Sequence, residues 1–140
     1  MTSKPSAFIY SPALDEYSYP PGHPFNTVRV KKTREILNSM GLLDGPDKME
    51  VPPQPVERLI LKKFHTPRYL HALQNASKGQ WDAEALNMGI GSTDCPVFDG
   101  MYEYALLAVG ATITAAPLQA RATCAEEMAC ATRLSPEGSR

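Results

Sequence analysis

The stretch GSTDCPVFDGMYEYA, residues 91–105, joins a polar loop to an apolar segment. Asp94 lies at this junction. From its residue type alone it is a good helix cap, because its carboxylate can accept hydrogen bonds from the first free backbone N–H groups of a helix. Pro96 would then lie in the first helical turn, where its missing N–H costs nothing. We therefore expect a helix over residues 96–116, apolar on nearly all sides and buried against several neighbours.

The composition is that of a small globular protein. A chain of 140 residues with 43% hydrophobic residues can form one domain with a real core. The net charge of −1 gives no general attraction to nucleic acid or to an anionic membrane. The three cysteines are an odd number and widely spaced, so a disulfide framework is not implied and a reducing compartment is the default. With no apolar signal core and no run long enough to span a bilayer, we expect a soluble, cytoplasmic protein.

The first fifty residues contain signals for a strand, a stiff loop and a helix. Residues 6–11 form an apolar run typical of a buried strand, and residues 15–24 are rich in Tyr and Pro, which forbids a helix. This second segment is either a stiff loop that holds aromatic rings in place or a plain surface connector. A helix is expected over residues 27–40, capped by Asn26 and ended by Gly41. Its buried face is predicted to contain Val28, Ile36, Leu37 and Met40.

The middle of the chain alternates loops and short elements. Residues 43–55 contain four prolines and are expected to be irregular, whereas residues 56–64 fit a strand or a helix. In the next helix Thr66 is the expected cap and Pro67 takes the first position. Its apolar stripe is Tyr69, Leu70, Leu73 and Ala76. Residues 79–89 are expected to be a polar connector.

Two histidines lie just before and within the helix that follows Thr66, but their spacing argues against a metal site. His65 and His71 are six residues apart and would not share a helix face, and no carboxylate or cysteine is placed to complete a set of ligands. The interpretation is that both are ordinary surface or packing residues.

The composition changes abruptly at Pro117. Residues 117–140 contain no Val, Ile, Phe, Tyr or Trp, so a strand is disfavoured there and only a weak helix over 122–132 is possible. Cys124 and Cys130 do not have a usual zinc spacing. We therefore expect two parts: residues 1–116, and a divergent, disordered tail over 117–140.

Five short motifs occur in one order along residues 6–116. They are FIYSP, GHPFN with Arg29 five residues after Pro24, FHTPRYLHAL, TDCPVFDGMYEYA and GATITAA. In this order they resemble the zinc-dependent histone deacetylases and the related bacterial acetoin-utilisation proteins. The resemblance implies an α/β fold: the N-terminal part of a three-layer sandwich around a mostly parallel sheet, here mostly helical with one or two strands. It also favours a short helix for residues 56–64.

The resemblance also implies roles for four residues. Asp94 would lie at the rim of an active-site channel and grip the backbone of an acylated substrate. His23, Pro24 and Arg29 would line the channel and an inner cavity for the released acetate, where a fixed cation suits a carboxylate. The simpler alternatives stay open: Asp94 as a helix cap only, and Arg29 in a surface salt bridge.

In the resembling family, a zinc ion held by two Asp and one His polarises the acyl carbonyl and activates water. Two adjacent His residues move protons and a Tyr stabilises the oxyanion. The sequence of this chain has no adjacent His pair and no Asp-x-His motif. It also lacks the later Gly-rich segment that carries the Tyr. We therefore expect the first third of such a domain, inactive alone and without bound zinc. A frameshift, an alternative exon or a mis-called gene would each produce it.

Three functions are compatible with this sequence to different degrees. The first is part of a deacetylase-like hydrolase acting on acetylated lysine or a small acetylated amide, with no direct nucleic-acid or membrane partner and an unspecified oligomeric state. The alternative is a non-catalytic helical module that binds a partner protein. A complete small enzyme of another class is weakest, because the sequence shows no nucleophile–base pair, phosphate-binding Gly loop or credible metal set.

Overall fold

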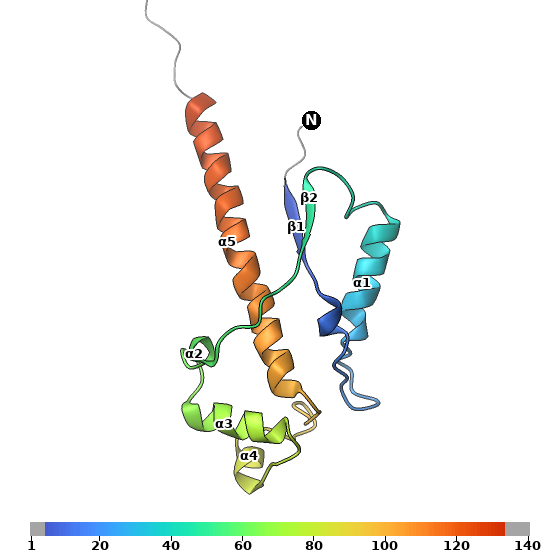
Figure 1. Cartoon of the computed structure of the whole chain (residues 1–140), viewed down its shortest axis with the longest axis vertical. Coiled ribbons are helices and arrows are strands. Elements are labelled where there is room, and N and C mark those ends of the chain that lie inside the picture. The colour runs from blue at the N-terminus through green and yellow to red at the C-terminus, as the bar shows by residue number, and fades with distance from the viewer. Residues whose placement is uncertain (1–4, 134–140) are drawn as a thin grey trace, which may run out of the picture.

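The computed structural model of the chain describes residues 5–133, and the side chains of residues 5–120 (Figure 1). Most of the described chain is helical and one small sheet accompanies the helices, as predicted. The elements in order are β1 (Ser6–Ile9), the 3-10 helix η1 (Pro12–Leu14), α1 (Val28–Ser39), β2 (Lys48–Val51), α2 (Arg58–Leu61), α3 (Pro67–Ala76), α4 (Ala83–Asn87) and α5 (Met101–Arg133).

The sheet consists of β1 and β2, which run parallel with Ser6 opposite Lys48 and Ile9 opposite Val51. The expectation of an irregular loop over residues 43–55 is therefore wrong at its centre. A strand of four residues between prolines has too little local pattern to be recognised, and the partner that holds it lies far upstream in the sequence. By contrast, β1 confirms a strand at the start of the chain, although it is shorter than the predicted residues 6–11. The prediction that this strand is buried is wrong, because Ser6 and Ala7 are exposed and Phe8 and Ile9 are only partly buried.

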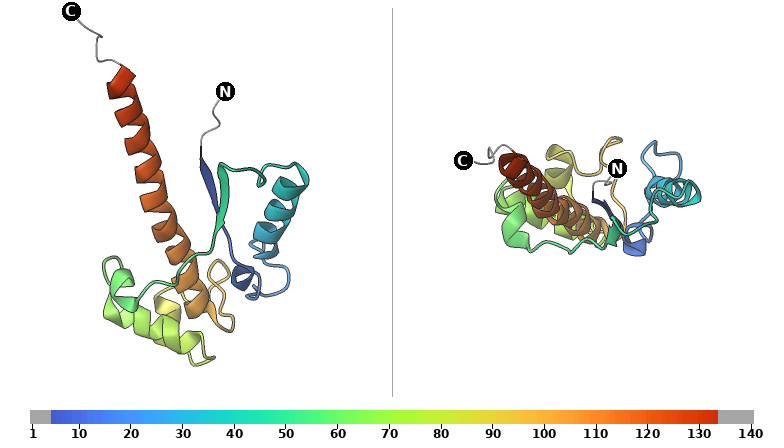
Figure 2. Two further views of the ribbon diagram at one scale, coloured as in Figure 1. Left: turned by 45° about the horizontal axis from the view of Figure 1, so that its top comes forward. Right: turned by 90° about the horizontal axis from the view of Figure 1, so that it is seen from above.

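Helices lie on both sides of the strands. Figures 1 and 2 show α1 on one side of the strands and the long helix α5 on the other. The main core lies below the sheet in Figure 1, where the start of α5 packs on α3 and α4 packs on α3 in turn. Its buried members are Leu61, Leu70, Leu73, Ala76, Ala85, Ile90, Met101 and Tyr102.

Helices α2 and α3 form where they are predicted. The hydroxyl oxygen of Thr66 accepts a hydrogen bond from the Tyr69 N–H at 3.2 Å, and Pro67 occupies the first helical position. Leu70, Leu73 and Ala76 are buried, which confirms most of the predicted stripe.

Helix α1 departs from its predicted packing. None of its residues is buried, and the side chains of Ile36 and Met40 are 58% and 65% exposed. A polar link holds it to the sheet instead: the Arg34 guanidinium donates to Glu50 of β2 at 2.6 Å and lies 5.0 Å from the Tyr10 ring centroid. Asn26 accepts from the Val28 N–H at 2.9 Å, one residue before the Thr27 cap position.

The connector expected over residues 79–89 contains the helix α4. A carboxylate oxygen of Asp82 caps it by accepting from the Ala85 N–H at 3.0 Å, and Ala85 is buried. A helix of five residues is too short to show a periodic pattern, which is why the sequence did not reveal it.

Helix α5 begins and ends later than predicted. It starts at Met101 rather than Pro96, and it continues past Ala116, through Pro117, to Arg133. The boundary predicted at 116/117 thus falls within a helix, and the division of the chain there stays a prediction. The side chains of Cys124 and Cys130 and all of residues 134–140 lie outside what the structure describes.

An extended segment before α2 crosses α5 at Gly110. The Val56 N–H donates to the Leu106 carbonyl at 3.2 Å, and the Gln54 N–H donates to the Thr114 hydroxyl at 3.4 Å. A Cβ on Gly110 would lie only 2.0 Å from the Gln54 carbonyl oxygen, so this close crossing requires glycine. Among the described residues, no helix is long and apolar enough to cross a membrane.

Candidate functional site

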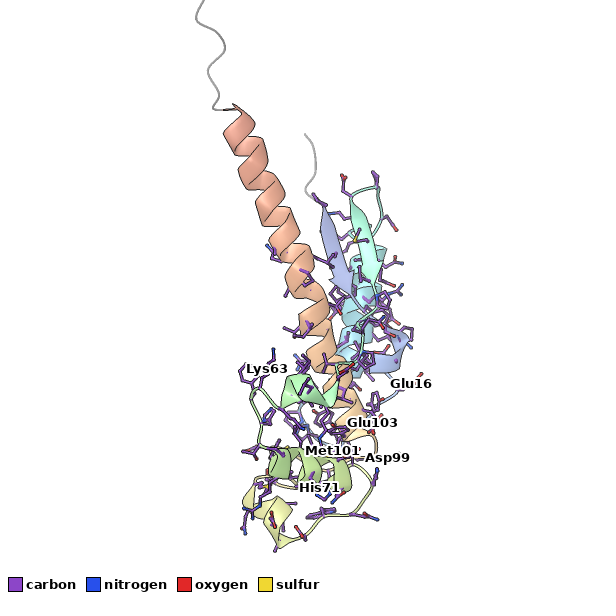
Figure 3. The ribbon with its side chains drawn as sticks, turned by 60° about the vertical axis from the view of Figure 1, so that its left-hand side comes forward. Glu16, Lys63, His71, Asp99, Met101 and Glu103 are labelled. Atoms are coloured by element: carbon purple, nitrogen blue, oxygen red, sulfur yellow. The ribbon has the colours of Figure 1, made fainter. Side chains whose placement is uncertain are left out.

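A cavity of about 360 Å³ lies between α3, the loop before α5 and the first turns of α5. Met101, labelled in Figure 3, lies between these two helices and forms part of the cavity wall. The other lining residues are Tyr19, Leu61, His65, Tyr69, Leu70, Leu73, Asp94, Cys95, Pro96, Phe98, Tyr104, Ala105, Ala108 and Val109.

The loop that carries Asp94 is closed by its own hydrogen bonds. The Gly91 N–H donates to the Cys95 carbonyl at 2.8 Å, and the Cys95 N–H donates to the Ser92 hydroxyl at 3.2 Å. Asp94 lies between these bonds, exposed, at the rim of the cavity. The cap interpretation is wrong, because α5 begins seven residues further on at Met101. The loop forms a separate turn there, which leaves the carboxylate available to a ligand.

Aromatic rings form one wall of the cavity. The ring centroid of Tyr19 lies 4.6 Å from that of Phe98 and 6.4 Å from that of Tyr104, and the last two are 6.1 Å apart. Tyr69 from α3 lines the cavity as well, with the His65 ring stacked 5.0 Å away. The cavity is therefore a slot with largely apolar walls and a carboxylate at its opening.

The tyrosine hydroxyls in this wall hold their protons firmly. Burial raises the pKa of Tyr19, Tyr69 and Tyr104 above the ordinary value of 10.0. Repulsion from the negative charge of an ionised Cys95 raises the pKa of the first two further, and repulsion from an ionised Tyr19 does so for Tyr104. These hydroxyls are neutral near pH 7 and can act as hydrogen-bond donors.

The structure brings only some of the predicted site residues together. His23 stacks on Tyr19 at 4.9 Å between centroids and accepts from the Phe25 N–H at 3.2 Å, so it touches the cavity wall from behind. Pro24 and Arg29 are exposed, and neither lines the cavity.

Sequence reasoning missed the aromatic side chains that form the wall. Of the two interpretations of residues 15–24, the stiff loop that holds aromatic rings fits the structure, because Tyr19 comes from this segment. Which ring would meet Phe98 or Tyr104 depends on a contact across some eighty residues, and no local pattern contains that information.

Metal-binding side chains are not gathered at this site. In the part of the chain whose side chains are described, no three His, Cys, Asp or Glu residues lie close enough to hold a metal ion. His65 lines the cavity, whereas His71 lines a different groove of about 860 Å³ between α3 and α4 (Figure 3).

Comparison with known proteins identifies relatives of this chain. Residues 23–136 match the family model of the histone deacetylase domain. The acetoin utilization protein AcuC of Bacillus subtilis is 40% identical over 112 residues, which cover 79% of this chain and 28% of that protein. Histone deacetylase 3 of rice is 38% identical over 115 residues, which cover 78% of this chain and 22% of that protein. Histone deacetylase RPD3 of Saccharomyces cerevisiae is 29% identical over 133 residues, which cover 89% of this chain and 30% of that protein. The chain thus spans about a quarter of the length of these relatives.

Proposed function

The chain belongs to the histone deacetylase domain family, and from this we propose that it supplies the substrate-binding wall of a zinc-dependent deacetylase-like hydrolase. The observation that supports the proposal is the position of Asp94 at the rim of a cavity walled by Tyr19, Phe98 and Tyr104. The proposed substrate is an acetylated lysine or a small acetylated amide.

The shape and chemistry of the cavity suit such a substrate. An acylated lysine has a long alkyl chain, which gains from apolar walls, and a polar backbone at one end. Asp94, exposed at the rim, would accept a hydrogen bond from a backbone N–H of the substrate, and bonds to a charged acceptor are stronger than neutral ones. The apolar wall would hold the alkyl chain below it.

His23, Pro24 and Arg29 are proposed to line the inner end of the channel in a complete domain. The stacking of His23 on Tyr19 supports this for the histidine. Arg29 is exposed here, so its role in an acetate cavity requires further polypeptide to cover it. The arrangement of α1, the strands and α5 supports the proposal that such a domain is a three-layer sandwich around a mostly parallel sheet (Figure 1).

Zinc belongs to this proposal only for the complete domain. The described side chains do not bring three ligands together, so they do not fit a zinc site, and no catalytic step is assigned to a metal in this chain. We expect the chain alone, given zinc, to show no turnover of an acetyl-lysine peptide and no tight zinc binding in a calorimetric titration.

A second candidate function is a non-catalytic helical module that binds a partner protein. Several large apolar side chains are exposed, including Phe64 at 91%, Leu59 at 65% and Met40 at 65%. Exposed apolar surface of this kind can mark an interaction site.

The proposed role of Asp94 can be tested in a completed domain. Residues 1–116 are joined to the part of B. subtilis AcuC that follows its matching region, and kcat/KM is measured on an acetyl-lysine peptide. Asp94→Asn keeps an oxygen that can accept but removes the charge, and a hydrogen bond to a charged group is about twice as strong as a neutral one. The substitution should therefore lose about half of the roughly 1.5–3 kcal/mol that such a bond contributes and lower kcat/KM by about three- to tenfold.

Asp99→Asn is the matched control, because Asp99 is exposed in the same loop and does not line the cavity. It should leave kcat/KM nearly unchanged. Equal effects of the two substitutions, or a loss of activity explained by a loss of stability, would refute the substrate role.

A further inference from the structure

Helix α5 receives its N-terminal cap from another helix. Gly100, the residue directly before α5, has no side chain that could accept from the first N–H groups of the helix. The hydroxyl oxygen of Ser77, which directly follows α3, accepts a hydrogen bond from the Tyr102 N–H at 3.1 Å instead. The capping side chain therefore comes from a position 25 residues before the N–H group that it caps.

Two further hydrogen bonds make this junction reciprocal. The Ser77 hydroxyl donates to Oε2 of Glu103 at 3.0 Å, and the Gly100 N–H donates to the Ser77 carbonyl at 3.4 Å. Glu103 lies in the first turn of α5 and is labelled in Figure 3. In an ordinary capping box, a Ser and a Glu three residues apart share the cap of their own helix. Here the same two residue types cap α5 from two different helices.

The junction lies within the core. Ser77 is 3% exposed and Tyr102 is 4% exposed. Removal of the Ser77 hydroxyl would leave the Tyr102 N–H buried without an acceptor, which is unfavourable enough to move the backbone. The hydrogen bonds of Ser77 thus hold the start of α5 in one position against the end of α3.

The two helices that meet at Ser77 form different walls of the cavity. Tyr69 and Leu73 line it from α3, and Tyr104 and Ala108 line it from α5. We infer that Ser77 is a positioning residue for this cavity, because it fixes the start of α5 against the end of α3 and so sets the spacing between the two walls. The inference rests on the proposed function only in treating the cavity as the substrate site.

The test compares the full chain with its Ser77→Ala variant by NMR, well below the unfolding temperature. Alanine has nearly the size of serine but lacks the hydroxyl. We expect the Tyr102 amide to exchange about tenfold faster or more, because it loses its acceptor. The ring signals of Phe98 and Tyr104 should shift, because both rings are held by the start of α5.

Ile90→Val is the matched control for stability. Ile90 is fully buried in the same core but does not line the cavity. The loss of one buried methylene group should lower the unfolding temperature, yet leave the ring signals of Phe98 and Tyr104 in place. A change in stability alone would therefore not imitate the effect of Ser77→Ala.

Glu103→Ala tests the reciprocal bond. It removes the acceptor of the Ser77 hydroxyl and should shift the same ring signals in the same direction, but by less. The double variant should shift them no further than Ser77→Ala alone, because both residues act through one junction.

Four results would overturn the inference. They are ring signals that stay in place in Ser77→Ala, equal shifts in Ser77→Ala and Ile90→Val, additive shifts in the double variant, and a Tyr102 amide that already exchanges freely in the unmodified chain. None of these measurements uses a substrate. Their failure is therefore distinct from a failure of the Asp94→Asn experiment, which would refute the proposed function instead.

Discussion

At the scale of single residues, Gly100 controls the entry into α5. Its φ of +71° favours glycine, and a Cβ there would lie 2.7 Å from Cε1 of Tyr17. The Tyr17 ring in turn packs on Tyr104, with centroids 5.4 Å apart. Gly100→Ala should destabilise the chain by more than about 1 kcal/mol, measured by thermal unfolding. Gly22→Ala is the control, since Gly22 also has a positive φ, +84°, but a Cβ added there would meet no heavy atom within 4 Å. If both substitutions lowered the stability equally, the close contact with Tyr17 would not contribute to the effect of Gly100→Ala.

Two partly buried tyrosines of the cavity wall give a second prediction at this scale. Burial raises the pKa of Tyr19 and Tyr104 above 10.0 in the folded chain. Their contribution to stability is therefore fully present below about pH 10 and is lost as the pH rises through the folded pKa values. Unfolding temperatures should fall above about pH 10, with tyrosinate absorbance rising late in the folded chain. Tyr19→Phe and Tyr104→Phe should each reduce the fall in unfolding temperature above about pH 10. If neither substitution changes that fall, these tyrosines are not its source.

At the scale of elements, the crossing at Gly110 ties two parts of the chain together. An added Cβ would lie 2.0 Å from the Gln54 carbonyl oxygen, 2.8 Å from the Gln54 carbonyl carbon and 3.3 Å from the Pro55 Cα, and all three are backbone atoms that have little room to move. Alanine is a better helix former by about 1 kcal/mol, but overpacking costs about 1–3 kcal/mol. Because a contact of 2.0 Å is far too close, the steric cost should exceed the gain in helix propensity, and Gly110→Ala should lower the unfolding temperature. Thr112→Ala, at an exposed position of α5, should raise it slightly or leave it unchanged.

Elements with a strong local pattern were predictable, and those held by distant contacts were not. The Thr66 cap and the apolar face of α3 depend only on residues close together in the sequence, and the structure contains both. β2 exists because β1 pairs with it, and a short strand has no pattern of its own. The apolar residues of α1 have helical spacing, yet Ile36 and Met40 remain exposed, because spacing fixes a common face but not a neighbour to cover it. At the site, the family resemblance named Asp94, which lines the cavity, and His23, which stacks on Tyr19, and the roles of both stay predictions. The wall of rings depends on contacts between segments far apart in the sequence.

At the scale of the whole molecule, the core formed by the described side chains, those of residues 5–120, involves only the first turns of α5. The core cluster and the residues packed against it extend no further than Val109. Removal of residues 117–140 should therefore change the unfolding temperature by no more than about 2 °C, a shift well below that of losing 1 kcal/mol in a domain of this size. A fall of several degrees would show that the tail contributes to the fold.

Helix α5 also governs how the chain moves through a solvent. Its 33 residues extend about 50 Å at 1.5 Å per residue, whereas a compact chain of 140 residues, with a radius of gyration of about 14 Å, corresponds to a sphere only about 37 Å across. A rod of this length raises the frictional coefficient well above that of a sphere of 15.3 kDa. On a gel-filtration column calibrated with globular standards, even a monomer would elute early and imitate a larger species. Elution volume alone would thus overstate the mass of this protein.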